Sequence, residues 1–186
     1  MIAGLALAGG RSRRFGTEKA VALVGGEPML QRVLELLRPC CTALAASARL
    51  ESGAAMLAVR LGVPVLHDAE GDPEGPLAGI SAGLAWAEGI GAARLLVAPC
   101  DTPFLPADYA ARLLATDPAM PAVAVAGGEL QPLCSVWPTH LLADVKAALA
   151  DGHPAVHAML TRLGATQVAF EDASAFRNIN RIEDLD

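Results

Sequence analysis

Residues 5–20 read LALAGGRSRRFGTEKA. An apolar run ends at two adjacent glycines, Gly9 and Gly10, and is followed by a loop with three arginines and then by Lys19. Glycines let the backbone approach a ligand and present N–H groups to an anion, while arginine and lysine side chains pair with phosphate oxygens. The stretch therefore predicts a buried strand that leads into a phosphate-binding loop. A solvated basic turn is the alternative for an isolated RSRR run.

The rest of the chain alternates short apolar runs with segments of helical period. The predicted strands cover residues 2–8, 42–47, 63–67, 95–99, 122–126 and 167–170, and a turn within residues 127–137 leads into another. The predicted helices cover residues 29–37, 52–61, 77–86, 108–115, 141–150 and 156–163. This alternation predicts a Rossmann-like three-layer α/β sandwich, with a mostly parallel sheet flanked by helices. Residues 2–8, 63–67 and 95–99 are almost wholly apolar, so we expect both faces of these strands to be covered.

Length and charge restrict the class of protein. A chain of 186 residues favours a single domain over residues 1–186, and its 53% hydrophobic content supplies a sizeable core. The net charge of −6 argues against a nucleic-acid or anionic-membrane partner. Any anion that the protein binds must therefore meet local positive charge.

The cysteines and the apolar runs indicate a location. The four cysteines show no CxxC spacing, which is typical of reduced thiols and favours the cytoplasm. No uncharged stretch approaches the roughly 18 apolar residues that a membrane-spanning helix needs. The apolar-then-basic start is the reverse of a secretory signal.

Ligands of parallel sheets bind beyond the carboxyl ends of the strands. Here that rule directs attention to the positions just after Ala8, His67, Pro99 and Ala126. The loop after the first strand fits neither of the two commonest nucleotide-binding patterns. The Walker pattern fails because Thr17 follows Gly16, and the GxGxxG pattern fails because the two glycines after the strand are adjacent.

Instead, LAGGRSRRFGTEKA resembles LAGGxSxRMGxDKA, the signature of the MobA-like molybdenum cofactor guanylyltransferases, with Phe15 for Met and Glu18 for Asp. Further segments match that family in order as far as the last residue. They are GGEPML at 25–30 for NGxPLI, GPLAGI at 75–80, PCDTPFLP at 99–106, GGELQPLCSVW at 127–137 for DGxxQPLxALW, and FRNINRIEDLD at 176–186 for FxNINTPEDL.

The resemblance implies transfer of GMP from GTP to the terminal phosphate of molybdopterin, which forms molybdopterin guanine dinucleotide and releases pyrophosphate. It assigns catalysis to Arg14, Lys19 and Asp101. It assigns nucleotide binding to Leu7, Ala8, Gly9, Gly10, Lys19, Asp68, Gly75, Pro76, Leu77, Gly79 and Asp101. Molybdopterin would be bound by Gln131, Pro132, Asn178 and Asn180.

These residue types suit that chemistry. Gly-Pro at a helix start leaves N–H donors for an anion, although an ordinary Pro-initiated helix has the same pattern. Asp101 at the end of a buried strand suits Mg²⁺, which proteins hold through one or two carboxylates and substrate phosphates; capping of the next turn is the alternative. The amides of Asn178 and Asn180 can bind phosphate or pterin, or brace the C-terminal turn.

The nucleotide base and the class of activity stay open at this stage. Within the resemblance, LAGG favours GTP and the related LAAG loop uses CTP, but Ala48 stands where the family usually has an Asn near the nucleotide. The alternatives are a cytidylyltransferase of the same cofactor, another NTP transferase such as a sugar-phosphate nucleotidyltransferase, and a non-catalytic nucleotide-binding protein. Contact with molybdoenzymes or their chaperones is also left open. The four histidines show no catalytic pairing and receive no role.

Overall fold

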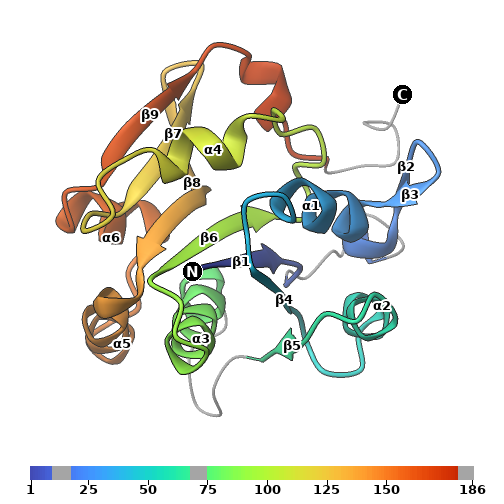
Figure 1. Ribbon diagram of the computed structural model, residues 1–186, viewed down its shortest axis with the longest axis horizontal. Coiled ribbons are helices and arrows are strands. Elements are labelled where there is room, and N and C mark those ends of the chain that lie inside the picture. The colour runs from blue at the N-terminus through green and yellow to red at the C-terminus, as the bar shows by residue number, and fades with distance from the viewer. Residues whose placement is uncertain (10–17, 68–74, 180–186) are drawn as a thin grey trace.

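A computed structural model describes residues 1–9, 18–67 and 75–179. Within these residues the main sheet has seven strands in the order β5-β4-β1-β6-β8-β7-β9 (Figure 1). Their bounds are β1 Ile2–Leu7, β4 Ala43–Ser47, β5 Val65–Leu66, β6 Arg94–Pro99, β7 Ala122–Ala126, β8 Glu129–Pro138 and β9 Thr166–Phe170. Parallel pairs join β1 to β4 and β6, β4 to β5, and β7 to β9, whereas β8 lies antiparallel between β6 and β7. The predicted mostly parallel sheet is confirmed.

Helices cover both faces of the sheet, which confirms the three-layer α/β sandwich (Figure 1). One core cluster joins the sheet to α1 (Met29–Leu37), α2 (Gly53–Arg60) and α4 (Tyr109–Leu114). The other joins it to α3 (Pro76–Gly89), α5 (Leu142–Ala150) and α6 (Val156–Arg162). Successive side chains of a strand point to opposite faces, so Leu5 and Leu7 enter the second cluster while Ala6 enters the first.

Local sequence explains why residues 29–37 form the helix α1. In α1 the buried side chains recur at helical spacing: Met29, Leu30, Val33, Leu34 and Leu37. Burying each large apolar side chain contributes about 1.5–3 kcal/mol, which holds α1 against the sheet. The hairpin before it, β2 (Leu23–Val24) and β3 (Glu27–Pro28), turns through Gly25 and Gly26, both with positive φ. A two-residue turn of this kind favours glycine at both positions.

One expectation about strands is wrong, and one confirmed strand is irregular. The predicted strand 63–67 is only Val65–Leu66, and both residues are half-buried because β5 is the edge strand, so the expected cover on both faces is absent there. The predicted strand within 127–137 is β8, which carries an irregularity. Val123 pairs with Ser135, and the next residue of β7, Ala124, pairs with Gln131, so residues 132–134 bulge out of the ladder. Proline lacks an N–H group, so Pro132 suits such a bulge.

In the part of the chain that the structure describes, no helix is both long and apolar enough to cross a membrane.

Candidate active site

The carboxyl ends of β1 and β6 lie side by side. The Cys100 N–H donates to the carbonyl oxygen of Leu7 at 2.9 Å, and the Ala8 N–H donates to that of Ser47 at 2.8 Å. A Cβ placed on Gly9 would have no atom of residues 1–9, 18–67 or 75–179 within 4 Å. The structure therefore places Leu7, Ala8 and Gly9 at the carboxyl edge of the sheet, where Asp101 also follows its strand.

A charged pair occupies this edge. Lys19 begins the short helix η1 (Lys19–Val21), and Asp101 follows β6. The Lys19 Nζ lies 3.5 Å from Asp101 Oδ2, with side-chain exposures of 22% and 25%. Each charge is thus reachable from solvent, so the pair can meet a bound polyanion with one cation and one potential metal ligand.

The C-terminal segment also reaches Asp101. The Ile179 N–H donates to the Asp101 carbonyl oxygen at 2.8 Å, and the Ile179 side chain is buried with Val24 and Met29. Asn178 is exposed beside it. One buried apolar side chain therefore anchors the predicted amide next to the charged pair.

The N-terminus of α3 packs on the same edge. A Cβ on Gly79 would lie 2.8 Å from Ser47 Oγ and 3.1 Å from Leu7 Cδ2, so only glycine permits this approach of the helix. Gly75 precedes the helix and Pro76 begins it. Leu77 is buried in the core, so it can offer a ligand its backbone but not its side chain.

Of the predicted molybdopterin residues in β8, Gln131 is the last paired residue before the bulge and Pro132 is the first residue of the bulge; both are half-buried. Two thiols of this region, Cys100 and Cys134, are buried. Burial raises the pKa of both thiols, and the nearby Asp101 carboxylate raises each pKa further. Both are therefore protonated at neutral pH and are not nucleophiles.

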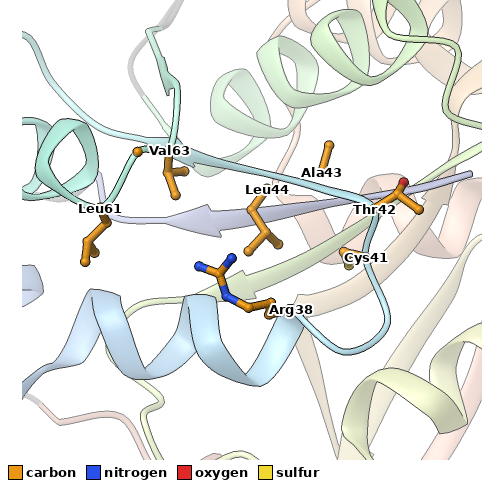
Figure 2. Close-up of a pocket in the computed structure, with 8 residues that line it drawn as sticks. Arg38, Cys41, Thr42, Ala43, Leu44, Leu61 and Val63 are labelled. Carbon is orange, nitrogen blue, oxygen red and sulfur yellow. The ribbon is translucent and has the colours of Figure 1, made fainter.

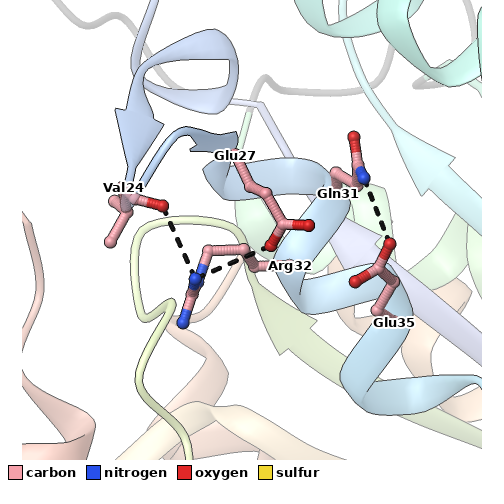
Figure 3. Close-up of polar contacts among 5 residues, drawn as sticks. All are labelled: Val24, Glu27, Gln31, Arg32 and Glu35. Atoms are coloured by element: carbon pink, nitrogen blue, oxygen red, sulfur yellow. Dashed lines mark hydrogen bonds and ion pairs between the residues drawn. The ribbon is translucent and has the colours of Figure 1, made fainter.

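Arg32 on α1 makes contacts that no sequence motif predicts (Figure 3). Its Nη1 donates to the Val24 carbonyl oxygen at 3.5 Å and lies 3.7 Å from Glu27 Oε2, so it ties α1 to the β2–β3 hairpin. Its guanidinium lies 6.0 Å from the ring centre of Phe104, in the loop that follows Asp101. No motif marks Arg32, because on an amphipathic helix it has the pattern of an ordinary surface residue.

Position 48, where the resemblance expects an amide, is a buried alanine. The carbonyl oxygen of Ala48 lies 2.8 Å from His67 Nδ1. A carbonyl can only accept, so Nδ1 carries the proton. The histidine thus links the ends of β4 and β5.

Four predicted site residues lie outside the described residues: Gly10, Arg14, Asp68 and Asn180. Among residues 1–9, 18–67 and 75–179 there is no group of three or more His, Cys, Asp or Glu side chains that could enclose a metal ion. Asp101 alone suits a metal that takes most of its ligands from water and from substrate phosphates, as Mg²⁺ does.

Two small cavities of about 140 and 130 Å³ lie elsewhere. The larger is lined by Arg38, Cys41 and residues at the amino end of β4, the opposite edge of the sheet from Asp101 (Figure 2). Burial raises the pKa of the Cys41 thiol to about 12. Neither of these two cavities includes the charged pair.

Comparison with known proteins agrees with this geometry. Residues 4–167 match the MobA-like NTP transferase domain. The chain belongs to that family. Two relatives of this MobA-like NTP transferase are named molybdenum cofactor guanylyltransferase. The protein from Cereibacter sphaeroides is 45% identical over 98% of this chain and 92% of its own length, and that from Rhodobacter capsulatus is 42% identical over 99% and 93%.

Solved structures share the fold of this MobA-like NTP transferase. The molybdopterin-guanine dinucleotide biosynthesis protein A of Archaeoglobus fulgidus superposes with a TM-score of 0.74 at 23% identity, covering 98% of this chain and 94% of the other. A 2-C-methyl-D-erythritol 4-phosphate cytidylyltransferase from Thermus thermophilus superposes with a TM-score of 0.67 at 18% identity, covering 97% and 94%. Membership of the family makes the chain a nucleotidyltransferase, and these two superpositions show the shared α/β fold.

Proposed function

We propose that this protein is a molybdenum cofactor guanylyltransferase, which transfers GMP from GTP to the terminal phosphate of molybdopterin and releases pyrophosphate. The observation that carries the proposal is the Lys19–Asp101 pair, 3.5 Å apart and reachable at the carboxyl edge of the sheet. A cation beside a potential metal ligand is what transfer from a nucleoside triphosphate to a phosphate acceptor needs. Relatives named for this activity, 42–45% identical over nearly the whole chain, support the choice of substrates.

The reaction requires alignment and charge neutralisation more than proton transfer. The attacking phosphate of molybdopterin already carries negative charge, so the mechanism assigns no general base. Gly9, Gly10 and Arg14 bind the phosphates of GTP, and Lys19 neutralises charge that develops on the transferring group. Asp101 would hold Mg²⁺, which would offset the negative charge of the substrate phosphates.

Three further groups of residues orient the substrates. The start of α3, at Gly75–Pro76, directs backbone N–H groups and the positive end of the helix dipole toward the nucleotide, together with Asp68. Gln131 and Pro132, at the start of the β8 bulge, bind molybdopterin. Asn178 and Asn180 bind it from the C-terminal segment, which Ile179 anchors to Asp101.

The proposal treats residues 1–186 as a single nucleotidyltransferase domain, in line with a family match that extends over residues 4–167. It also places the reaction in the cytoplasm, where the four cysteines would stay reduced; all four are free thiols here.

The test is turnover with molybdopterin, Mg²⁺ and each of GTP, CTP, ATP and UTP, for the wild-type protein and for Asp101→Asn. We expect molybdopterin guanine dinucleotide from GTP only, and loss of most of that product in the variant. Preference for CTP would replace the guanine assignment with a cytidylyltransferase. Nucleotide-dependent thermal stabilisation without product from any nucleotide would leave a nucleotide-binding protein and refute the enzyme.

A further inference from the structure

The side chain of Glu18 binds a segment that is distant in the sequence. Its Oε2 accepts a hydrogen bond from the Gly53 N–H at 2.6 Å, and its Oε1 accepts one from the Ala54 N–H at 3.2 Å. Gly53 and Ala54 are the first two residues of α2. Glu18 therefore caps a helix 35 residues away while it stands next to Lys19 in the chain.

Two side chains accept hydrogen bonds from the first backbone N–H groups of α2. The first N–H groups of a helix lack intrahelical partners, and the positive end of the helix dipole favours a carboxylate there. Ser52 caps locally, since its Oγ accepts from the Ala55 N–H at 3.1 Å. Glu18 supplies the charged, long-range half of the cap, in bonds of the stronger charge-assisted kind.

Close packing accompanies these bonds. A Cβ on Gly53 would lie 3.0 Å from Glu18 Oε2 and 3.3 Å from Val21 Cγ1, so glycine at that position lets η1 approach the helix. The helical turn then continues through backbone bonds, because the Val21 N–H donates to the Glu18 carbonyl oxygen at 3.1 Å. The Ala20 side chain is buried. The residues on both sides of Lys19 are thus held against the body of the protein.

We propose that Glu18 is a positioning residue for nucleotidyl transfer: its carboxylate, bound to the N-terminus of α2, holds the neighbouring Lys19 in place opposite Asp101. The inference rests on the proposed function, because it concerns how the cation of that site is aligned. It also assigns the N-terminus of α2 to a protein carboxylate, which leaves substrate phosphate to the glycine-rich loop and the start of α3.

The test compares Glu18→Gln with Ser52→Ala in steady-state turnover of GTP and molybdopterin. Each variant weakens the cap of the same helix, so both are expected to lower the melting temperature by a few degrees, and Ser52 serves as the matched control. In Glu18→Gln an NH₂ donor replaces one acceptor and faces backbone N–H donors. Misplacing a charged group by about 1 Å costs up to about 100-fold in rate. We expect kcat to fall about 10- to 100-fold for Glu18→Gln, with KM for GTP changed less than about threefold, and to stay near wild type for Ser52→Ala.

A double variant checks that Glu18 acts through its neighbour. Under the proposal, Glu18→Gln combined with Lys19→Met is about as slow as Lys19→Met alone, since a cation that is absent cannot be misplaced. A further tenfold loss in the double variant would overturn the inference. So would equal kcat losses in Glu18→Gln and Ser52→Ala, which would indicate a merely structural cap. Absence of turnover in the wild-type protein would instead refute the proposed function.

Discussion

Replacement of Lys19 by methionine tests the candidate site most directly. Methionine keeps the length and apolar stem of the side chain and removes only its charge. At 3.5 Å, Coulomb's law gives about 1.2 kcal/mol for the pair with Asp101 in a water-like dielectric. Side chains that are 22% and 25% exposed, with screening by salt and the entropy of holding both in place, reduce the net contribution to at most about 1 kcal/mol. For a chain of this length that corresponds to about 2–4 °C in melting temperature.

The expected effect on turnover is much larger. A preorganised charge aimed at the transferring phosphate contributes about 10²–10³ in kcat, or about 2.7–4 kcal/mol. Lys146, the only other lysine of the chain, is exposed on α5 and gives the matched control Lys146→Met. The assay is formation of molybdopterin guanine dinucleotide from GTP, alongside a thermal melt of each protein. A loss below tenfold for Lys19→Met, or an equal loss for Lys146→Met, would refute the reasoning.

Three further predictions concern packing and charge. Arg94 is buried, and its guanidinium donates to carbonyl oxygens at the end of α4. Replacement of Arg94 by methionine is therefore expected to lower the free energy of unfolding by about 2–4 kcal/mol. Urea denaturation measures this, and a change below about 1 kcal/mol would contradict it. Gly79→Ala must displace Ser47 or the N-terminus of α3, so we expect the free energy of unfolding to fall by about 1–3 kcal/mol and the KM for GTP to rise. Gly89 lies in the same helix with open space around its Cβ, so Gly89→Ala is expected to be neutral or stabilising. Equal effects of the two substitutions would be inconsistent with the close approach of α3 to Ser47. Burial keeps the thiols of Cys41, Cys100 and Cys134 protonated in the folded protein above the ordinary thiol pKa of about 8.5. The free energy of unfolding is therefore fully retained below that pH and falls above it by up to about 1.4 kcal/mol per pH unit for each thiol. Denaturation between about pH 8 and 10 tests this, and a flat profile would exclude it.

The α/β class was predictable because its signals are local. The apolar run before Gly9 and the helical spacing in residues 29–37 depend on neighbours within a few positions, and both elements appear where expected. The rule that ligands bind beyond the strands directed attention to the edge of the sheet at which Asp101 and Lys19 lie together. The prediction of a covered strand at 63–67 was wrong, because a short apolar run does not reveal whether it lies at the centre or at the edge of a sheet.

Pairs of residues distant in the sequence could not be predicted, because no local pattern specifies them. The Glu18 cap on α2 joins segments 35 residues apart, and in the motif Glu18 had the pattern of a conservative replacement and no more. Arg32 gave no signal for a similar reason, since its partners come from the hairpin and from the loop after Asp101.

By itself, the sequence determined the alternation of the main-sheet strands with helices, the position of a glycine- and arginine-rich loop after the first strand and the identity of the charged residues, since these follow from side-chain type and short-range spacing. Only the tertiary structure decided the sheet order, the antiparallel insertion of β8 with its three-residue bulge, and the 3.5 Å meeting of Lys19 with Asp101. The physical reason is that strand pairing and long-range contacts depend on how the whole chain buries its apolar faces, and many pairings are compatible with one local pattern.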